Sequence, residues 1–280
     1  MQLQKIEQPI NYEEVLTEIV ENCVGDEIMP FVRCLKFPFK FCEKLLNKKG
    51  ISWKTKVEIA KRNDCPESVL VKLCKRNGER FLRAFLYSLE RNDCSETSPM
   101  RKQISDVVVD TILTKPCGLD MLCIHPVRFT ENAQEKIINQ CFGYKICGSG
   151  YSFTHYLFDF IRSQDTIPQH CIARISEAMD KDREKRLRVL DDYEESHFKR
   201  QKKMLGCMKT PVDEGLCIEV VENYEKEHDK PCLRKVASNP SISKYVEMLL
   251  SMKFSHDEEI ALCMKRSEDD RNAWRQEHDK

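Results

Sequence analysis

The chain has 280 residues, a formal net charge of zero and only 9 glycines. A chain of this length can bury one large core or two smaller ones. Its 33% charged and 41% hydrophobic residues suit helices with an apolar stripe and a charged outer face, whereas an all-β protein with many tight turns needs more glycine. No apolar run approaches the ~18 residues of a membrane span, which excludes a transmembrane helix.

Fifteen cysteines are spread singly along the chain, unlike the clustered cysteines of a small disulfide scaffold. The first residues, MQLQKIEQPINYEEVL, lack the apolar segment of a secretory signal. We therefore expect reduced thiols that serve as small core residues, and we expect the protein to be cytoplasmic.

The first predicted helix begins after Asn11, a good N-cap residue that has Glu14 three positions later. Gly25 is expected to end this helix. Its apolar stripe follows helical periodicity and comprises Val15, Leu16, Ile19, Val20 and Cys23.

Proline and glycine then divide the chain into helical pieces of roughly 10 to 18 residues. Two helix starts are predicted at Ser98–Pro99 and Thr210–Pro211, where a hydroxyl residue precedes proline. Another is predicted at Ser255, which has Glu258 three residues later. Such short pieces indicate pairs of short helices and argue against a few long bundle helices.

The segment from Ile172 to Met208 is interpreted as one long helix or two joined helices. The charged run Asp180–Arg186 interrupts its apolar stripe, so a sustained coiled coil is not expected. A charged linking helix and an ordinary surface helix both remain open. The last residues, Ser267 to Lys280, are polar and are expected to fray.

Two corners of the chain share one layout, in which a helix ends on a small residue, an Asn-containing turn follows, and a new amphipathic helix begins. One corner runs from Ile59 to Leu70 and the other from Val236 to Val246. Arg62–Cys65 also recurs as Arg91–Cys94, 29 residues later. Cys123–Pro126 is a candidate fourth corner.

These corners resemble the leucine-rich repeat variant, a helical repeat with a Leu-Ala-x-Asn-Pro pattern. The matching residues are Ile59, Ala60, Asn63, Pro66 and Leu70 in one copy, with the Asn shifted by one place, and Val236, Ala237, Asn239 and Pro240 in another, where Ser243 replaces a second proline. The resemblance covers about a third of the chain and implies a HEAT-like superhelix of stacked helices. The founding member of that family holds an iron–sulfur cluster on a separate cysteine-rich segment. This chain matches no such segment, so no cofactor is expected.

The predicted fold is therefore all-α, with stacked helical-hairpin repeats in an α-solenoid-like arrangement, a long charged helix and a smaller C-terminal helical part. We predict a helical repeat array over residues 1–165, the charged helix or linker over 166–209, and the C-terminal part over 210–280.

Metal and catalytic chemistry find little support in the sequence. The zinc candidates are Cys117, Cys123, His125, Cys141, Cys147 and His155. Their five-residue gaps are too long for a zinc knuckle, and Cys141 falls on the apolar face of a helix predicted over Glu131–Phe142. His170 and Cys171 are adjacent, so their side chains point about 100° apart on a helix. The glycine-rich stretch 143–153 lacks a preceding strand and is interpreted as an ordinary loop. No catalytic, cofactor or metal residue is predicted.

The basic block, residues 33–86, carries 15 Lys and Arg against 5 acids, whereas the first thirty residues have a net charge of −6. Lysines mixed with aromatic residues can hold phosphates and stack bases. The aromatic residues are Phe37, Phe39, Phe41 and Trp53, and the nucleic-acid-binding candidates are Lys36, Lys40, Lys44, Lys48, Lys49, Lys54 and Lys56. A solvated face of a helical array is the other interpretation, because Phe37, Phe41 and Leu45 share the helical spacing of a core.

We expect a non-enzymatic binding protein that recognises another protein through a helical-repeat surface. Nucleic-acid binding through the basic block is the alternative. Both expectations start from fold analogy. The composition is also typical of a host-interaction or regulatory factor of a virus or an intracellular microbe.

Overall fold

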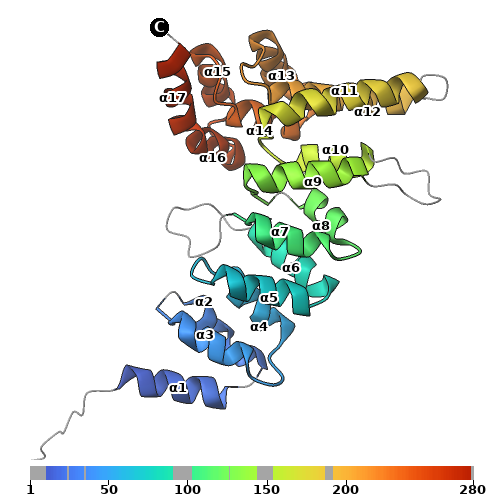
Figure 1. Ribbon diagram of the computed structural model, residues 1–280. Helices are drawn as coiled ribbons and strands as arrows, with labels where there is room; N and C mark the ends of the chain where they lie inside the picture. The colour runs from blue at the N-terminus through green and yellow to red at the C-terminus, as the bar shows by residue number, and fades with distance from the viewer. Residues whose placement is uncertain are drawn as a thin grey trace, which may run out of the picture. The chain divides into compact units, whose positions relative to one another are not determined.

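The computed structural model describes residues 11–23, 25–34, 36–90, 103–125, 127–143, 154–186 and 192–278. In these ranges the regular structure consists of seventeen α-helices and one 3-10 turn (Figure 1). The described residues form no strand, and Ile104 and Phe129 make an isolated bridge. The all-α class is therefore confirmed.

The chain divides into two compact units. The first unit extends to residue 102, together with Asp110–Ile112, and the second comprises Gln103–Val109 and Leu113–Lys280. The helices of the first unit are α1 (Tyr12–Asn22), α2 (Met29–Arg33), α3 (Phe39–Leu46), α4 (Trp53–Ala60), α5 (Glu67–Arg76) and α6 (Glu79–Glu90), with the 3-10 turn η1 (Gly25–Ile28) before α2. The predicted boundaries at residues 165 and 209 stay predictions.

α7 (Asp106–Leu113) has residues in both units. The other helices of the second unit are α8 (Gly118–Ile124), α9 (Glu131–Gly143), α10 (Thr154–Ser163), α11 (Gln169–Arg186), α12 (Asp192–Cys207), α13 (Glu214–Glu227), α14 (Lys230–Ser238), α15 (Lys244–Phe254), α16 (Glu258–Arg266) and α17 (Glu268–His278).

Helices two positions apart in the chain pack against each other in both units. In the first unit α1 contacts α3, α2 contacts α4, and α4 contacts α6. In the second unit the same rule joins α8, α10, α12, α14 and α16 in succession, and it joins α13 to α15. Helical hairpins that pack on the next hairpin produce this pattern. The α-solenoid-like arrangement and the family resemblance stay predictions.

Local capping chemistry decides where the helices begin. The Asn11 side chain accepts a hydrogen bond from the Glu13 backbone N–H at 3.2 Å, which confirms the predicted N-cap of α1. The starts predicted at Thr210–Pro211 and at Ser255 are wrong, since Asp213 caps α13 and Asp257 caps α16. A carboxylate two or three residues further along accepts from the first N–H groups and sets the start instead. The start predicted at Ser98–Pro99 lies outside the described residues.

The charged segment after residue 168 forms two helices, α11 and α12 (Figure 1). Of the two interpretations, one long helix or two joined helices, the structure shows the second. Arg183 on α11 binds Glu195 on α12 at 2.8 Å. Further along, Lys202 on α12 donates to Ser176 Oγ and Asp180, both at 2.6 Å. Charged groups thus join the two helices where the apolar stripe is interrupted.

Side-chain donors satisfy the carbonyl groups at the ends of helices. A helix leaves its last four carbonyls without an intrahelical partner. Arg62 is buried and donates to Val32 O and Phe37 O, both at 2.7 Å, at and beyond the end of α2. Asn239 is also buried and donates to Cys207 O at 2.8 Å, at the end of α12. Each donor therefore ties a corner to a helix about 30 residues earlier in its own unit.

Arg62 and Asn239 occupy equivalent positions in the two repeat corners. Aligning Ile59-Ala60 with Val236-Ala237 places Arg62 opposite Asn239, without the one-residue shift that Asn63 requires. The corners themselves are confirmed, because α4 ends at Ala60 and α14 at Ser238, and a new helix follows each turn. Arg62 and Asn239 therefore make equivalent hydrogen bonds, through a guanidinium in one corner and an amide in the other.

Lys235 on α14 is a fully buried lysine. Its ammonium donates to Gln164 O at 2.8 Å and to Arg162 O at 3.4 Å, at the end of α10. Burial lowers the pKa of Lys235 to about 8. The nearby Asp165 opposes this change, but it binds Arg234 directly at 2.6 Å.

The prediction that Ser267 to Lys280 frays is wrong, since residues 268–278 form α17. Arg271 anchors this helix and is only 2% exposed. Its guanidinium donates to Ala237 O at 3.2 Å, to Met264 O, to Ser267 Oγ and to Glu247. A polar segment forms a stable helix here because one buried cation contacts α14, α15 and α16.

We expect Arg271→Met to lower the free energy of unfolding by about 2–4 kcal/mol, because the carbonyls and Glu247 lose a buried donor. Urea unfolding followed by circular dichroism measures this change. Asn272→Ala, at an exposed neighbouring position, is the matched control and should stay within about 0.5 kcal/mol of the parent. Equal stabilities of the two variants would contradict the anchoring role.

We expect Lys235 to make stability depend on pH. Between about pH 8 and pH 10.5 the unfolded chain binds a proton at Lys235 that the folded chain does not. The contribution of Lys235 to stability should therefore rise with pH in this window, by up to about 1.4 kcal/mol per unit. Urea unfolding of the parent and of Lys235→Met at pH 7.5, 8.5 and 9.5, in a reducing buffer, tests this.

The cysteines, whose buried thiols also titrate, are the same in the parent and in Lys235→Met. The difference in unfolding free energy between the two proteins therefore reports Lys235 alone. Burial raises the pKa of Cys42 and Cys217 to about 12, which removes stability as pH rises through the range where unfolded thiols ionise. A parent-minus-variant difference that is flat or falls with pH would contradict the lowered pKa of Lys235.

Candidate functional site

The lysines of the basic block differ in how freely they face solvent. Lys40 binds Glu13 of α1 at 2.5 Å, and Lys54 lies 3.7 Å from Asp26. Lys56 is partly buried and donates to Asn77 Oδ1 at 3.4 Å. Acids and amides of the first unit therefore occupy part of the positive charge that the sequence displays.

Lys48 has an internal role. Its ammonium donates to Val20 O at 2.9 Å, Glu21 O at 2.8 Å and Cys23 O at 3.0 Å, at the end of α1. Three donors directed at three carbonyls suit a helix C-terminus, which carries partial negative charge. Lys48 is therefore a structural residue that holds α1.

Lys36, Lys44 and Lys49 remain exposed, and no ion pair to them occurs among the described residues. Lys44 lies 5.1 Å from the centre of the Phe41 ring. Of the seven candidate lysines, these three are the ones that remain open to an acidic partner or a phosphate.

The aromatic residues of the basic block are mostly enclosed. Phe37 and Phe41 are 2% and 1% exposed and belong to the core that also contains Leu45. Phe39 is partly buried against the same core. The Arg80 guanidinium lies over the Trp53 ring, and its central carbon is 4.7 Å from the centre of that ring. Buried rings cannot stack on bases, so two of the four predicted stacking residues serve the core.

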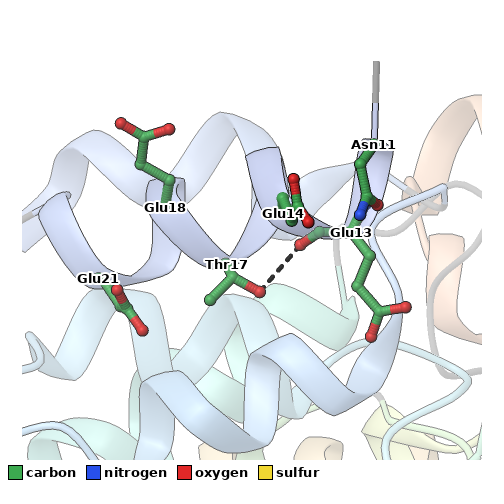
Figure 2. A pocket seen from close by; sticks show the side chains of 6 residues that line it. All are labelled: Asn11, Glu13, Glu14, Thr17, Glu18 and Glu21. Atoms are coloured by element: carbon green, nitrogen blue, oxygen red, sulfur yellow. Dashed lines mark hydrogen bonds between the residues drawn. The ribbon is translucent and has the colours of Figure 1, made fainter. Parts of the chain in front are cut away.

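A shallow hollow lies on α1, lined by Asn11, Glu13, Glu14, Thr17, Glu18 and Glu21 (Figure 2). All six residues come from one helix and its cap, so the hollow lies between neighbouring side chains of one surface. The Thr17 hydroxyl donates to Glu13 O at 2.9 Å. This surface presents negative charge, part of which Lys40 of α3 neutralises at Glu13, and none of its lining residues comes from a second element.

The zinc candidates do not converge on one point where they are described. Cys123 and Cys141 lie 3.8 Å apart, both buried, and burial holds the pKa of Cys123 well above its usual range. Cys141 lies on the buried face of α9, as predicted. Across the described ranges, no three His, Cys, Asp or Glu side chains form a group suited to a metal ion. Cys147 and the His155 side chain lie outside them.

The remaining sequence candidates for chemistry are separated by burial. Cys171 is fully buried, whereas the neighbouring His170 side chain is exposed and lies 3.5 Å from Glu135. The glycine-rich stretch beyond Gly143 lies outside the described residues. Among the helices that the structure describes, none has both the length and the apolar composition needed to cross a bilayer.

The clearest solvent-facing apolar surface is on α15, where sequence analysis placed no site. Tyr245, Met248 and Met252 are 48%, 49% and 70% exposed, and we call them the α15 outer stripe. Their spacing of three and four residues puts them within an arc of about 60° on the helix. Val246 and Leu250, on the opposite side, are fully buried. α15 is thus apolar on both sides, whereas a surface helix is usually polar toward solvent.

Neighbouring elements hold α15 in place from its buried side. Ser243 caps its start by accepting from the Val246 N–H at 3.2 Å. Glu247 binds Arg271 at 3.2 Å and Arg275 at 2.6 Å, both on α17. Burial by itself raises the pKa of Glu247. The two arginines lower this pKa by more than burial raises it, so the net shift is downward. The only acid of α15 is therefore ionised and internally neutralised.

The apolar stripe has a detectable signal in the sequence. The segment Lys244–Phe254 carries two apolar sets on opposite helix faces, and only one of them can face the core. The sequence alone does not decide which one, because both sets have helical spacing.

Comparison of the chain with protein-family models, with curated proteins and with solved structures found no match.

We expect Lys48→Met to lower the free energy of unfolding by about 1–2 kcal/mol, because three carbonyls at the end of α1 lose their donor. Lys49→Met removes the same charge from an exposed neighbour and should change stability by less than about 0.5 kcal/mol. Urea unfolding monitored by circular dichroism compares the two. Equal effects would show that Lys48 acts only as a surface charge.

Proposed function

We propose that this chain is a non-enzymatic binding protein that recognises another protein through its helical surface, with the α15 outer stripe as the contact site. The carrying observation is the exposure of Tyr245, Met248 and Met252 on a helix that already buries its other side. Large apolar side chains grouped on one solvent-facing surface are typical of interaction sites. Tyrosine and methionine suit such sites, the first as an anchor and the second as an adaptable contact.

The helical packing supports this proposal. Helices that contact the helix two positions ahead recur within each unit, and stacked helix pairs present an extended surface for partners. A host-interaction or regulatory role, in a reducing cytoplasm that keeps cysteines as thiols, fits the same reading of the chain.

Nucleic-acid binding by the basic block is the second candidate. It is supported by the exposed lysines Lys36, Lys44 and Lys49. It is weakened by the internal roles of Lys40, Lys48, Phe37 and Phe41. The protein-binding proposal is therefore preferred.

Photo-crosslinking in cells that make the protein naturally tests the proposal. A chain carrying Tyr245→p-benzoylphenylalanine should give discrete protein adducts on illumination, because this position lies in the proposed contact. The yield should fall at least tenfold when Met252→Glu is added, since a charge in the apolar contact must be desolvated. Adduct identity is read by mass spectrometry.

Probes at Tyr12→p-benzoylphenylalanine and Lys49→p-benzoylphenylalanine are the controls, both at exposed positions in the first unit. Adducts that form equally from all three probes would contradict a contact site on α15. Adducts that form only from the Lys49 probe and disappear after nuclease digestion would favour the nucleic-acid alternative.

A further inference from the structure

We infer that Cys123 and Cys141 form a redox-responsive thiol pair, which closes to a disulfide under oxidising conditions and thereby fastens α9 to α8. This inference goes beyond the proposed function and does not depend on it. It is carried by the contact between the two sulfur atoms and by the place of each cysteine near the end of its helix.

The two thiols already touch. Their Sγ atoms lie 3.8 Å apart, whereas the sulfur atoms of a disulfide are about 2.05 Å apart, so closure needs an approach of about 1.8 Å. α8 packs against α9, and α10 packs against both. The pKa of Cys123 responds to Cys141 of α9 and to Asp159 of α10. The pair therefore lies where these three helices of the second unit meet.

Burial keeps the pair reduced while the helix ends stay closed. Both thiols are fully buried, and burial together with Cys141 holds the pKa of Cys123 well above its usual range. Because the thiolate is the reactive form, the closed protein reacts slowly. Cys123 is next to last in α8, and Cys141 is third from last in α9. Helix ends open at a lower free energy than global unfolding requires, so opening of these turns exposes the pair to an oxidant.

Closure is a two-electron oxidation, and its oxidant is a low-molecular-weight disulfide such as oxidised glutathione. In the first step one cysteine thiolate attacks a sulfur of the oxidant, breaks its S–S bond and releases one glutathione thiolate. In the second step the other cysteine thiolate attacks the protein sulfur of this mixed disulfide, and the second glutathione thiolate leaves. The protein has then lost two protons and two electrons, and the two released thiolates take up the protons. The second step is favoured because its two sulfur atoms are held in contact.

Other cysteines of the chain provide internal comparisons. Cys171 is also fully buried, and its raised pKa has no thiol among its causes, so its oxidation should stop at the mixed disulfide. Cys34 is exposed and should form a mixed disulfide first. Cys207 raises the pKa of Cys232, so these two thiols also lie close together, and their linkage must be distinguished by peptide mapping.

The test uses the full chain under native conditions. The protein is incubated with oxidised glutathione, the remaining thiols are blocked with N-ethylmaleimide in denaturant, and linked peptides are identified by mass spectrometry. The Cys123–Cys141 linkage should form at least tenfold faster than the mixed disulfide at Cys171, because it needs the opening of helix ends and not global unfolding. Dithiothreitol should reverse it.

The linkage should also slow hydrogen exchange in α9. The amides of Glu131–Gly143 should exchange at least tenfold more slowly after oxidation, because the disulfide limits the opening of this helix. Cys123→Ala and Cys141→Ala should each abolish this slowing, whereas Cys171→Ala, the matched buried control, should retain it. Circular dichroism checks the folding of each variant, and the peptide map of the parent does not depend on them.

Two results would overturn the inference. A Cys123–Cys141 linkage that is absent, or that forms no faster than the Cys171 adduct, would show that the two thiols serve only as core residues and meet an oxidant only on unfolding. A linkage that leaves the hydrogen exchange of α9 unchanged would show that the disulfide does not fasten this helix. Neither result bears on the proposed contact site on α15, which photo-crosslinking tests separately.

Discussion

The fold depends on one constraint, which is that the carbonyl groups at the end of each short helix must find donors. Short helices have a large share of unpaired end groups, because four carbonyls per helix lack an internal partner whatever its length. In this chain the donors are buried or partly buried side chains that arrive from a later corner or helix. Lys48 serves α1, Arg62 serves α2, Asn239 serves α12 and Arg271 serves α14. Each bond joins one helical layer to the next within its unit.

Because some cationic side chains bind backbone carbonyls inside the protein, the number of Lys and Arg residues in the sequence overstates the positive charge at the surface. Lys48, Arg62, Lys235 and Arg271 all count as charges in the sequence, but their polar groups face backbone carbonyls. The surface charge of the basic block is therefore smaller than the sequence indicates. A binding site that depends on that charge loses part of its support, whereas a site on α15 is unaffected.

The α15 outer stripe follows from the same organisation. Val246 and Leu250 are the buried residues that α15 contributes to the core. The C-terminal helix α17 binds Glu247 through Arg271 and Arg275. Tyr245, Met248 and Met252 are between 48% and 70% exposed, so their outward parts add little to the packing of the second unit. The proposed function, binding of another protein, would account for that composition on the outer side of the helix.

The sequence by itself determined the helical class, the start of α1 at Asn11, the burial of Cys141 and the two corners near Pro66 and Pro240. These features depend on local capping, on periodicity and on the scarcity of glycine, all of which act over a few residues. The tertiary structure alone decided that Arg62 and not Asn63 makes the carbonyl contacts equivalent to those of Asn239, that residues 268–278 fold around Arg271, and which apolar face of α15 stays in solvent. Those outcomes depend on carbonyls and side chains some 25 to 35 residues away, and no local pattern records which distant group will be adjacent.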